Sequence, residues 1–381
     1  MARPFQLTLQ DPFTSVRANS DAQGAIVALG TLGVNGFAAA VPAFNDHWYF
    51  RVPEWLGTYL GVTELRIYGH EAGHARVARF HGATATSIDM HFHWGVTHWE
   101  GALTNEQALE ATAAGMNQGE RDSWRMWSQV QRQRSWTYQE SLSYFLHHFN
   151  QSFYVLGSAL TDAAGARQGG DDVANYTDEQ LTGRPMSRWS VGVPSLLAAG
   201  LSPSMWQAVY QQVRFLGWGE RDAAPWRLSA GPVSFGMPHF EVLLAPRDRL
   251  VGGYQQLEIG SRVAIEASTH VGLDSGMVRE AARVDVQVLP WLTVSPYGAV
   301  TLVGSAPIGG SADRSATVGG VGGVGMTLAP LANAGLPGFA RGSFLSATFE
   351  YGANDAILQG IEHQPNGFRA ALSVGVTLPG R

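Results

Sequence analysis

The residues with the clearest chemical potential are His70, Glu71 and His74, which stand in the stretch IYGHEAGHARVARF. On an α-helix, side chains four positions apart lie on one side, about one turn apart, so both imidazoles can bind the same zinc ion. Glu71 lies beside them, where its carboxylate can accept a proton from a water that attacks a carbonyl group. The spacing predicts a zinc-binding helix with a general base. The alternative is two solvent-facing histidines on an amphipathic helix.

A catalytic zinc site needs a third protein ligand, because such sites combine three protein ligands with one open position. The chain contains no cysteine, so histidine, aspartate or glutamate must supply that ligand. A metzincin would have glycine and histidine where this chain has Val77 and Phe80, which excludes that subclass. The remaining candidates are Glu110 in ALEATAAG and Asp162 in VLGSALTDAAG.

Other histidines and acidic residues lie in segments for which the sequence predicts no metal site. His91, His93 and His98 lie in ATATSIDMHFHWGVTHWEGAL, whose Thr, Trp, Ile and Val content and glycine turn predict a hairpin. Asp171 and Asp172 lie in QGGDDVANYTDEQ, which lacks the twelve-residue pattern of a calcium-binding loop. That segment is typical of a solvated acidic loop.

The order of the motifs resembles the site-2 protease family of membrane zinc metallopeptidases. HEAGHARVARFHGATATSIDMHFHWG is similar to the H-E-x-G-H helix of that family and the strand pair that follows it. ATAAGMNQ looks like the second helix of the family, and LTDAAG looks like its third motif, an aspartate that supplies the last metal ligand. The resemblance implies that His70, His74 and Asp162 bind zinc. It also implies that Glu71 is the general base and that Asn117 helps to position the substrate.

The chain divides into a mainly helical part, residues 1 to 220, and a strand-rich part, residues 226 to 381. The resemblance lies within the first part, over residues 55 to 165. That part also contains GAIVALGTLGVNGFAAAVPAF, residues 24 to 44, an uncharged stretch long enough to cross a bilayer as a helix. Its high alanine and glycine content suits a buried core helix equally well, and its glycines would let another helix approach closely.

Residues 226 to 381 alternate between apolar and polar types with the period of β-strands. The clearest run is LEIGSRVAIEASTHVGL, residues 257 to 273, which we expect to be one long strand. About eight strands, long hairpins and one apolar face resemble the small barrels of bacterial outer membranes. The alternative is a soluble barrel or sandwich whose apolar face points inward.

The charge and amino-acid composition exclude several classes of function. The formal net charge of −6 gives no electrostatic reason to expect nucleic acid as a partner. All 25 basic residues are arginine, which excludes a Walker A phosphate loop and a lysine Schiff base. We therefore expect an α+β protein, with a helical, zincin-like N-terminal domain followed by an antiparallel β-barrel of about eight strands.

The expected function is that of a Zn²⁺-dependent peptidase that acts on protein or peptide substrates. The barrel indicates a location in the bacterial cell envelope, in contact with the lipid of the outer membrane. The alternative is a non-enzymatic outer-membrane protein whose helical domain has a binding or structural role.

Overall fold

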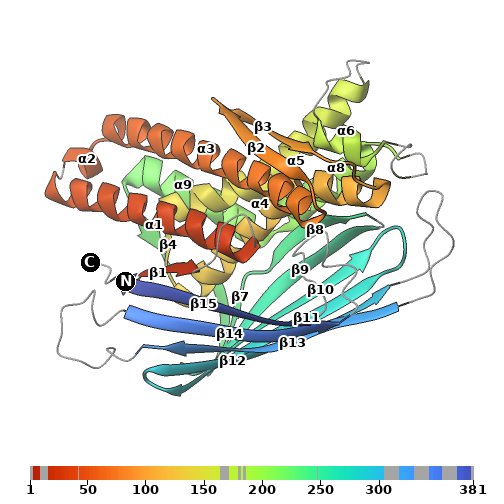
Figure 1. The fold of residues 1–381 in the computed structure, drawn as a ribbon. Coiled ribbons are helices and arrows are strands. Elements are labelled where there is room, and N and C mark those ends of the chain that lie inside the picture. The colour runs from red at the N-terminus through yellow and green to blue at the C-terminus, as the bar shows by residue number, and fades with distance from the viewer. Residues whose placement is uncertain are drawn as a thin grey trace.

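A layer of helices packs on one face of a large antiparallel sheet (Figure 1). The computed structural model describes residues 3–8, 16–41, 43–163, 171–178, 182, 186–246, 248–303, 317–329, 343–353 and 367–378. The helices of the layer are α1 (Val16–Ala40), α2 (Ala43–Asp46), α3 (Trp48–Phe80), α4 (Asn105–Gln133), α5 (Tyr138–Ala163), α6 (Asp172–Tyr176), α8 (Trp189–Leu201) and α9 (Pro203–Trp218).

Ten strands of the sheet follow the order β1-β15-β14-β13-β12-β11-β10-β9-β7-β6, and an eleventh strand, β8, pairs with β9. Two small antiparallel pairs, β2–β3 and β4–β5, lie outside this sheet. The strands are β1 (Arg3–Thr8), β2 (Thr84–His91), β3 (Trp94–Glu100), β4 (Trp136–Thr137), β5 (Asp222–Ala223), β6 (Arg227–Ala230), β7 (Val233–Gly236), β8 (His239–Ala245), β9 (Asp248–Ile259), β10 (Val263–Gly272), β11 (Val278–Leu289), β12 (Leu292–Val303), β13 (Thr317–Leu328), β14 (Ser343–Ala353) and β15 (Gly367–Leu378).

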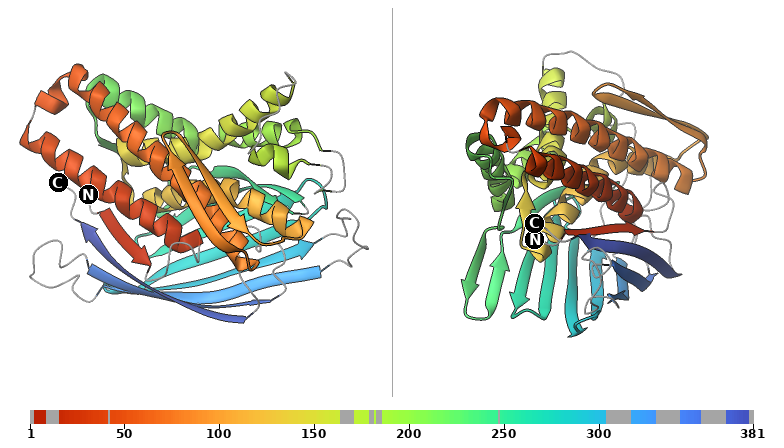
Figure 2. Two further views of the ribbon diagram at one scale, coloured as in Figure 1. Left: turned by 45° about the horizontal axis from the view of Figure 1, so that its top comes forward. Right: turned by 90° about the vertical axis from the view of Figure 1, so that its left-hand side faces the viewer.

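The prediction of a β-barrel is wrong, because the sheet is open. β1 and β6 stand at the two ends of the strand order, and no pairing joins them within the described ranges. From residue 226 onward the described chain forms ten strands, β6 to β15, rather than about eight. Figure 2 shows the reason: the sheet curves beneath the helices, which cover its concave face. The helix layer thereby shields the concave face of the sheet from solvent. In a barrel, closure of the sheet would shield that face.

The expected alternation is present in the sheet, and its polar face is the buried one. On β9 and β10 the carboxylates Glu258 and Glu266 and the imidazole of His270 are buried toward the helices. Their apolar neighbours Ile259 and Val271 are exposed on the opposite face. Because side chains alternate across a strand, covering one face with helices leaves the apolar face outside.

Residues 257 to 273 form two strands rather than one. β9 ends at Ile259 and β10 begins at Val263, with Gly260 in the turn at φ +62°. Ile259 and Val263 are directly opposite in the ladder and four positions apart in sequence. Both side chains therefore lie on the same face of the sheet. The apolar–polar alternation continues through the turn without interruption, so the sequence pattern does not reveal the turn.

The contact between α3 and α4 positions the motif helix. α4 begins with a capping box, in which Thr104 accepts from the backbone of Gln107 and the Gln107 side chain accepts from the backbone of Thr104. On α3, a Cβ at Gly73 would lie 2.7 Å from the carbonyl oxygen of Ala114. Only glycine therefore allows the two helices to approach this closely.

The predicted hairpin is confirmed, since β2 and β3 pair antiparallel and their turn contains His93 at φ +69°. The apolar stretch is helical from Gly24 to Ala40, within α1, and Ala18–Ala40 is by length and composition apolar enough to cross a membrane. Gly30, Gly33 and Gly36 do not mediate the expected close helix contact. A Cβ built at each of them meets no atom within 4 Å.

Asn117 connects α4 to the sheet. Its Nδ2 donates to the carbonyl oxygen of Leu244 at 2.7 Å, and the Leu244 amide donates to its Oδ1 at 2.8 Å. The side chain is buried, so it satisfies two backbone groups of β8 that solvent cannot reach. These contacts give Asn117 a role in the fold, and the substrate-positioning role that the family resemblance implies stays a prediction.

Asn117→Ala should lower the free energy of unfolding by about 2–4 kcal/mol, because two buried backbone groups lose their partners. Urea denaturation followed by circular dichroism measures this loss. The folded variant should bind zinc as the wild type does. A variant with native stability that no longer binds zinc would instead assign Asn117 to the metal site.

Candidate metal centre

Three side chains from α3 and α6 converge on one point. Oδ2 of Asp172 lies 2.8 Å from Nε2 of His70 and 3.2 Å from Nε2 of His74. The two Nε2 atoms lie 3.1 Å apart. α3 presents both histidines from adjacent turns, and α6 presents Asp172 as its first residue.

These distances fit a zinc ion. Zinc with bonds of about 2.0–2.1 Å in tetrahedral geometry separates its ligand atoms by about 3.3 Å, close to the spacing of the three atoms here. Nδ1 of His74 lies 2.7 Å from the carbonyl oxygen of Ala111, to which it donates. That bond keeps a proton on Nδ1 and turns Nε2 towards Asp172 and His70, so a metal ion that displaces the Nε2 proton would meet the lone pair of Nε2 there.

Gly115 on α4 lies directly against the ring nitrogens. A Cβ at this position would come within 2.4 Å of His74 Nε2 and 2.8 Å of His70 Nε2. A methyl group would therefore occupy space next to the convergence point. The helix layer leaves that space open only because residue 115 is glycine.

The electrostatics of the three groups also favour a cation. Burial alone would lower the pKa of His74, but the charge and hydrogen bond of Asp172 outweigh it and raise that pKa to about 9. Burial alone would raise the pKa of Asp172, but His74 and His70 hold the pKa of this carboxyl well below its usual range. The carboxylate thus stays charged and attracts positive charge to the two rings.

Glu71 lies beside this group and is held in place by the hairpin. Its carboxylate offers an oxygen within 4.8 Å of the ligand atoms of both histidines. The Thr97 hydroxyl on β3 lies 2.8 Å from Glu71 Oε2 and can donate to it. A Cβ at Gly95 would lie 2.7 Å from Glu71 Cγ, so β3 packs tightly over this side chain.

Tyr154 on α5 links the group to a cavity. Its hydroxyl accepts the backbone N–H of Asp172 at 2.9 Å, and its ring centroid lies 6.2 Å from that of His70. Burial, together with the charges of Asp172 and Asp171, raises the pKa of Tyr154 well above its usual range, so the hydroxyl keeps its proton. The cavity has a volume of about 390 Å³ and is lined by Tyr59, Thr63, Arg66, His93, Phe153 and Tyr154.

The other residues expected at the metal lie elsewhere. Asp162 is about half exposed near the end of α5, where its Oδ1 lies 3.7 Å from a guanidinium nitrogen of Arg188. Glu110 is buried, and its Oε2 lies 2.5 Å from Nε2 of His81. The structure thus brings His70, Glu71 and His74 together, and it places neither acidic candidate with them.

Asp172 is the candidate metal ligand that sequence reasoning missed. Its segment shows no periodicity that would place it near α3, and it follows His74 by 98 residues. The neighbouring Asp171 gives a partial signal, since its side chain accepts from the backbone N–H groups of Val173 and Ala174 and caps α6. A capping aspartate predicts a helix start, and the next aspartate then stands in the first turn of that helix.

Asp172→Ala should lose one bound zinc per chain after dialysis against a weak chelator. Mutation of a residue that only hydrogen-bonds to a metal ligand lowers metal affinity by about 10–100-fold, and loss of a ligand itself should lower it further. Asp162→Ala is the matched control and should retain the zinc. Elemental analysis of the two purified variants measures the difference. Loss of zinc in Asp162→Ala with retention in Asp172→Ala would reverse the ligand assignment.

The geometry of these side chains alone supports the assignment of a metal site. Comparison of the chain with protein-family models, and with the sequences of curated proteins, finds no match.

Proposed function

We propose that the protein is a zinc-dependent peptidase whose metal is held by His70, His74 and Asp172. The observation that carries the proposal is the position of Glu71, whose carboxylate reaches within 4.8 Å of the ligand atoms of both histidines. A carboxylate at this place suits a general base beside a catalytic metal. A catalytic metal also needs an open coordination position, which three protein ligands leave.

The residues around the metal have separate roles in this proposal. The zinc ion supplies Lewis-acid polarisation of the substrate carbonyl and lowers the pKa of water. Glu71 accepts the proton of the attacking water and passes it to the leaving amine, while Thr97 fixes the orientation of its carboxylate. Tyr154, which keeps its proton, donates to the carbonyl oxygen as negative charge develops there.

The surroundings favour an extended peptide as the substrate. β2 and β3 form a two-stranded sheet, so each has one edge without a strand partner within the described residues. β3 packs on α3 at Glu71, next to the scissile position of a bound chain. An extended peptide can pair with such an edge through backbone hydrogen bonds. The cavity beside Tyr154 can then hold one of its side chains.

Glu71→Gln should retain zinc and lose about 10²- to 10⁴-fold in the rate of peptide hydrolysis, because the amide cannot accept the proton. Cleavage of a library of fluorescence-quenched peptides by the zinc-loaded protein measures the rate. Glu280→Gln, the same exchange on the exposed surface of β11, should cleave as the wild type does. Equal rates in Glu71→Gln and wild type would contradict the proposal and favour a non-enzymatic role.

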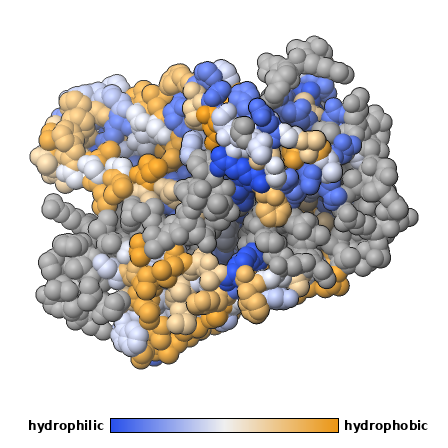
Figure 3. Space-filling model, in the orientation of Figure 1, coloured by the Kyte–Doolittle hydropathy of each residue, from blue (hydrophilic) through white to orange (hydrophobic). Residues whose placement is uncertain are grey.

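We infer further that the apolar outer surface of the protein contacts the lipid of a bacterial envelope membrane. Figure 3 shows apolar residues gathered over the strands and over part of the helix layer. Exposed apolar side chains include Val271, Val300, Leu302, Phe349 and Leu372 on the sheet and Ile26, Leu197 and Trp206 on helices. The open edges at β1 and β6 favour a sheet that lies against the bilayer, because unpaired backbone groups are not tolerated in hydrocarbon.

The purified protein should float with vesicles of phosphatidylethanolamine and phosphatidylglycerol in a density gradient. Val271→Asp combined with Val300→Asp should reduce the floated fraction, because each charged side chain at a lipid-facing position near the membrane interface costs up to about 1 kcal/mol. Asn105→Asp, a charge added at an exposed helix end, is the control. Flotation unchanged by the double substitution would remove lipid contact from this face.

A further inference from the structure

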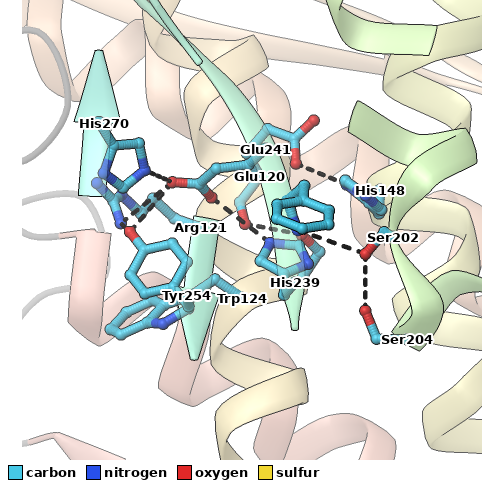
Figure 4. Close-up of polar contacts among 12 residues, drawn as sticks. Glu120, Arg121, Trp124, His148, Ser202, Ser204, His239, Glu241, Tyr254 and His270 are labelled. Carbon is cyan, nitrogen blue, oxygen red and sulfur yellow. Dashed lines mark hydrogen bonds and ion pairs between the residues drawn. The ribbon is translucent and has the colours of Figure 1, made fainter. Parts of the chain in front are cut away.

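A second group of histidines and carboxylates lies between the helix layer and the sheet (Figure 4). Glu120 comes from α4, His148 from α5, and His239 and Glu241 from β8. Each of the four residues is at most 1% exposed. None of them belongs to the candidate peptidase site, so this group is a separate feature of the fold.

The group has the geometry of a metal-ligand set. Glu120, His148 and His239 each offer one ligand atom, and these atoms lie within 4.8 Å of one another. His148 Nδ1 is 2.8 Å from Glu120 Oε2, and His239 Nε2 is 3.6 Å from Glu241 Oε2. The second separation is too long for a hydrogen bond and typical of two groups that share an ion.

The second line of evidence is a set of buried polar atoms that lack partners. His148 Nε2, His239 Nε2 and Glu241 Oε2 have no hydrogen-bond partner among the described residues. The other nitrogen of His239, Nδ1, is 2.8 Å from the Tyr144 hydroxyl and can donate to it. Nε2 then carries a lone pair that faces the carboxylates. Each unpartnered buried atom costs about 1–3 kcal/mol, and a single ion would satisfy both His239 Nε2 and Glu241 Oε2, which lie 3.6 Å apart.

The charges of Glu120 and Glu241 indicate that a bound cation would account for the unpartnered atoms. Glu241 is balanced by Arg121, whose guanidinium lies 3.7 Å away, and it accepts hydrogen bonds from Tyr254 and His270. Glu120 pairs with His148, and no arginine pairs with it in the part of the chain that the structure describes. A buried carboxylate whose partner is a histidine rather than an arginine has no permanently charged partner, which is unfavourable.

We propose that Glu120, His148 and His239 bind a second divalent metal ion, with Glu241 as a fourth ligand. Two histidines with carboxylates form a donor set that suits zinc. The site is closed, because its ligands are buried and come from two helices and a strand. Four protein ligands without an open position are typical of a structural zinc. The ion joins α4 and α5 to β8 and so fastens the helix layer to the sheet.

The test uses the full chain with Asp172→Ala, which isolates the second site. This protein should still bind one zinc per chain from zinc chloride, and removal of the ion by a strong chelator should lower its melting temperature by several degrees. Adding Glu120→Gln or His239→Gln should abolish the remaining zinc and the response to chelator. Glutamine is close in shape to both residues, and circular dichroism verifies that each variant retains its helices.

His147→Gln in the same background is the matched control. His147 is the neighbour of His148 on α5 and is equally buried, but its side chain contacts Ser143 and Gln23. It should retain the zinc and the melting response.

An Asp172→Ala protein that binds no zinc and melts at one temperature with or without zinc would overturn the proposal. Retention of the ion after Glu120→Gln or His239→Gln would overturn it as well. The peptidase proposal fails by different results, namely zinc kept at the first site in Asp172→Ala or full hydrolysis by Glu71→Gln.

Discussion

The close packing of α3 against α4 is the constraint on which the candidate peptidase site depends. Gly73 brings the backbones together, and Gly115 leaves room for the two imidazole rings. The same contact places the Ala111 carbonyl at Nδ1 of His74 and so selects the nitrogen that faces Asp172. This helix contact therefore leaves space for the rings of His70 and His74 and orients the His74 ring, and a side chain of ordinary size at either glycine would disturb both.

The helical motif could be predicted from sequence because its information is local. His70, Glu71 and His74 are fixed relative to one another by the helix itself, so their spacing is sufficient. Asp172 could not be predicted in the same way. Its position depends on how α5 and α6 fold back over α3, a tertiary arrangement that no local pattern encodes. The order of the motifs predicts Asp162 as a ligand, but its carboxylate lies beside Arg188 instead.

The sheet illustrates a related limit. Alternation in residues 257 to 273 correctly indicates two faces of opposite polarity, yet it carries no information on which face is covered. Here the helices cover the polar face, which creates a buried interface rich in carboxylates and imidazoles. Such an interface must satisfy its charged groups internally, and Glu258 with Arg134 and Glu266 with Arg132 are two examples. The cluster around Glu120 and Glu241 belongs to the same interface.

The pairing of β1 with β15 has a consequence for the order of folding. Strands β9 to β15 are joined to their sequence neighbours, so each can be added as soon as it is synthesised. β1 precedes the other described strands in sequence, but its partner β15 follows them all, with Phe5 opposite Val376. β1 therefore stays without this partner until β15 has been synthesised, and the entropy of closing so long a loop falls on that late step. The edge of the sheet at β1 thus depends on the pairing that joins the two most distant segments of the described sheet.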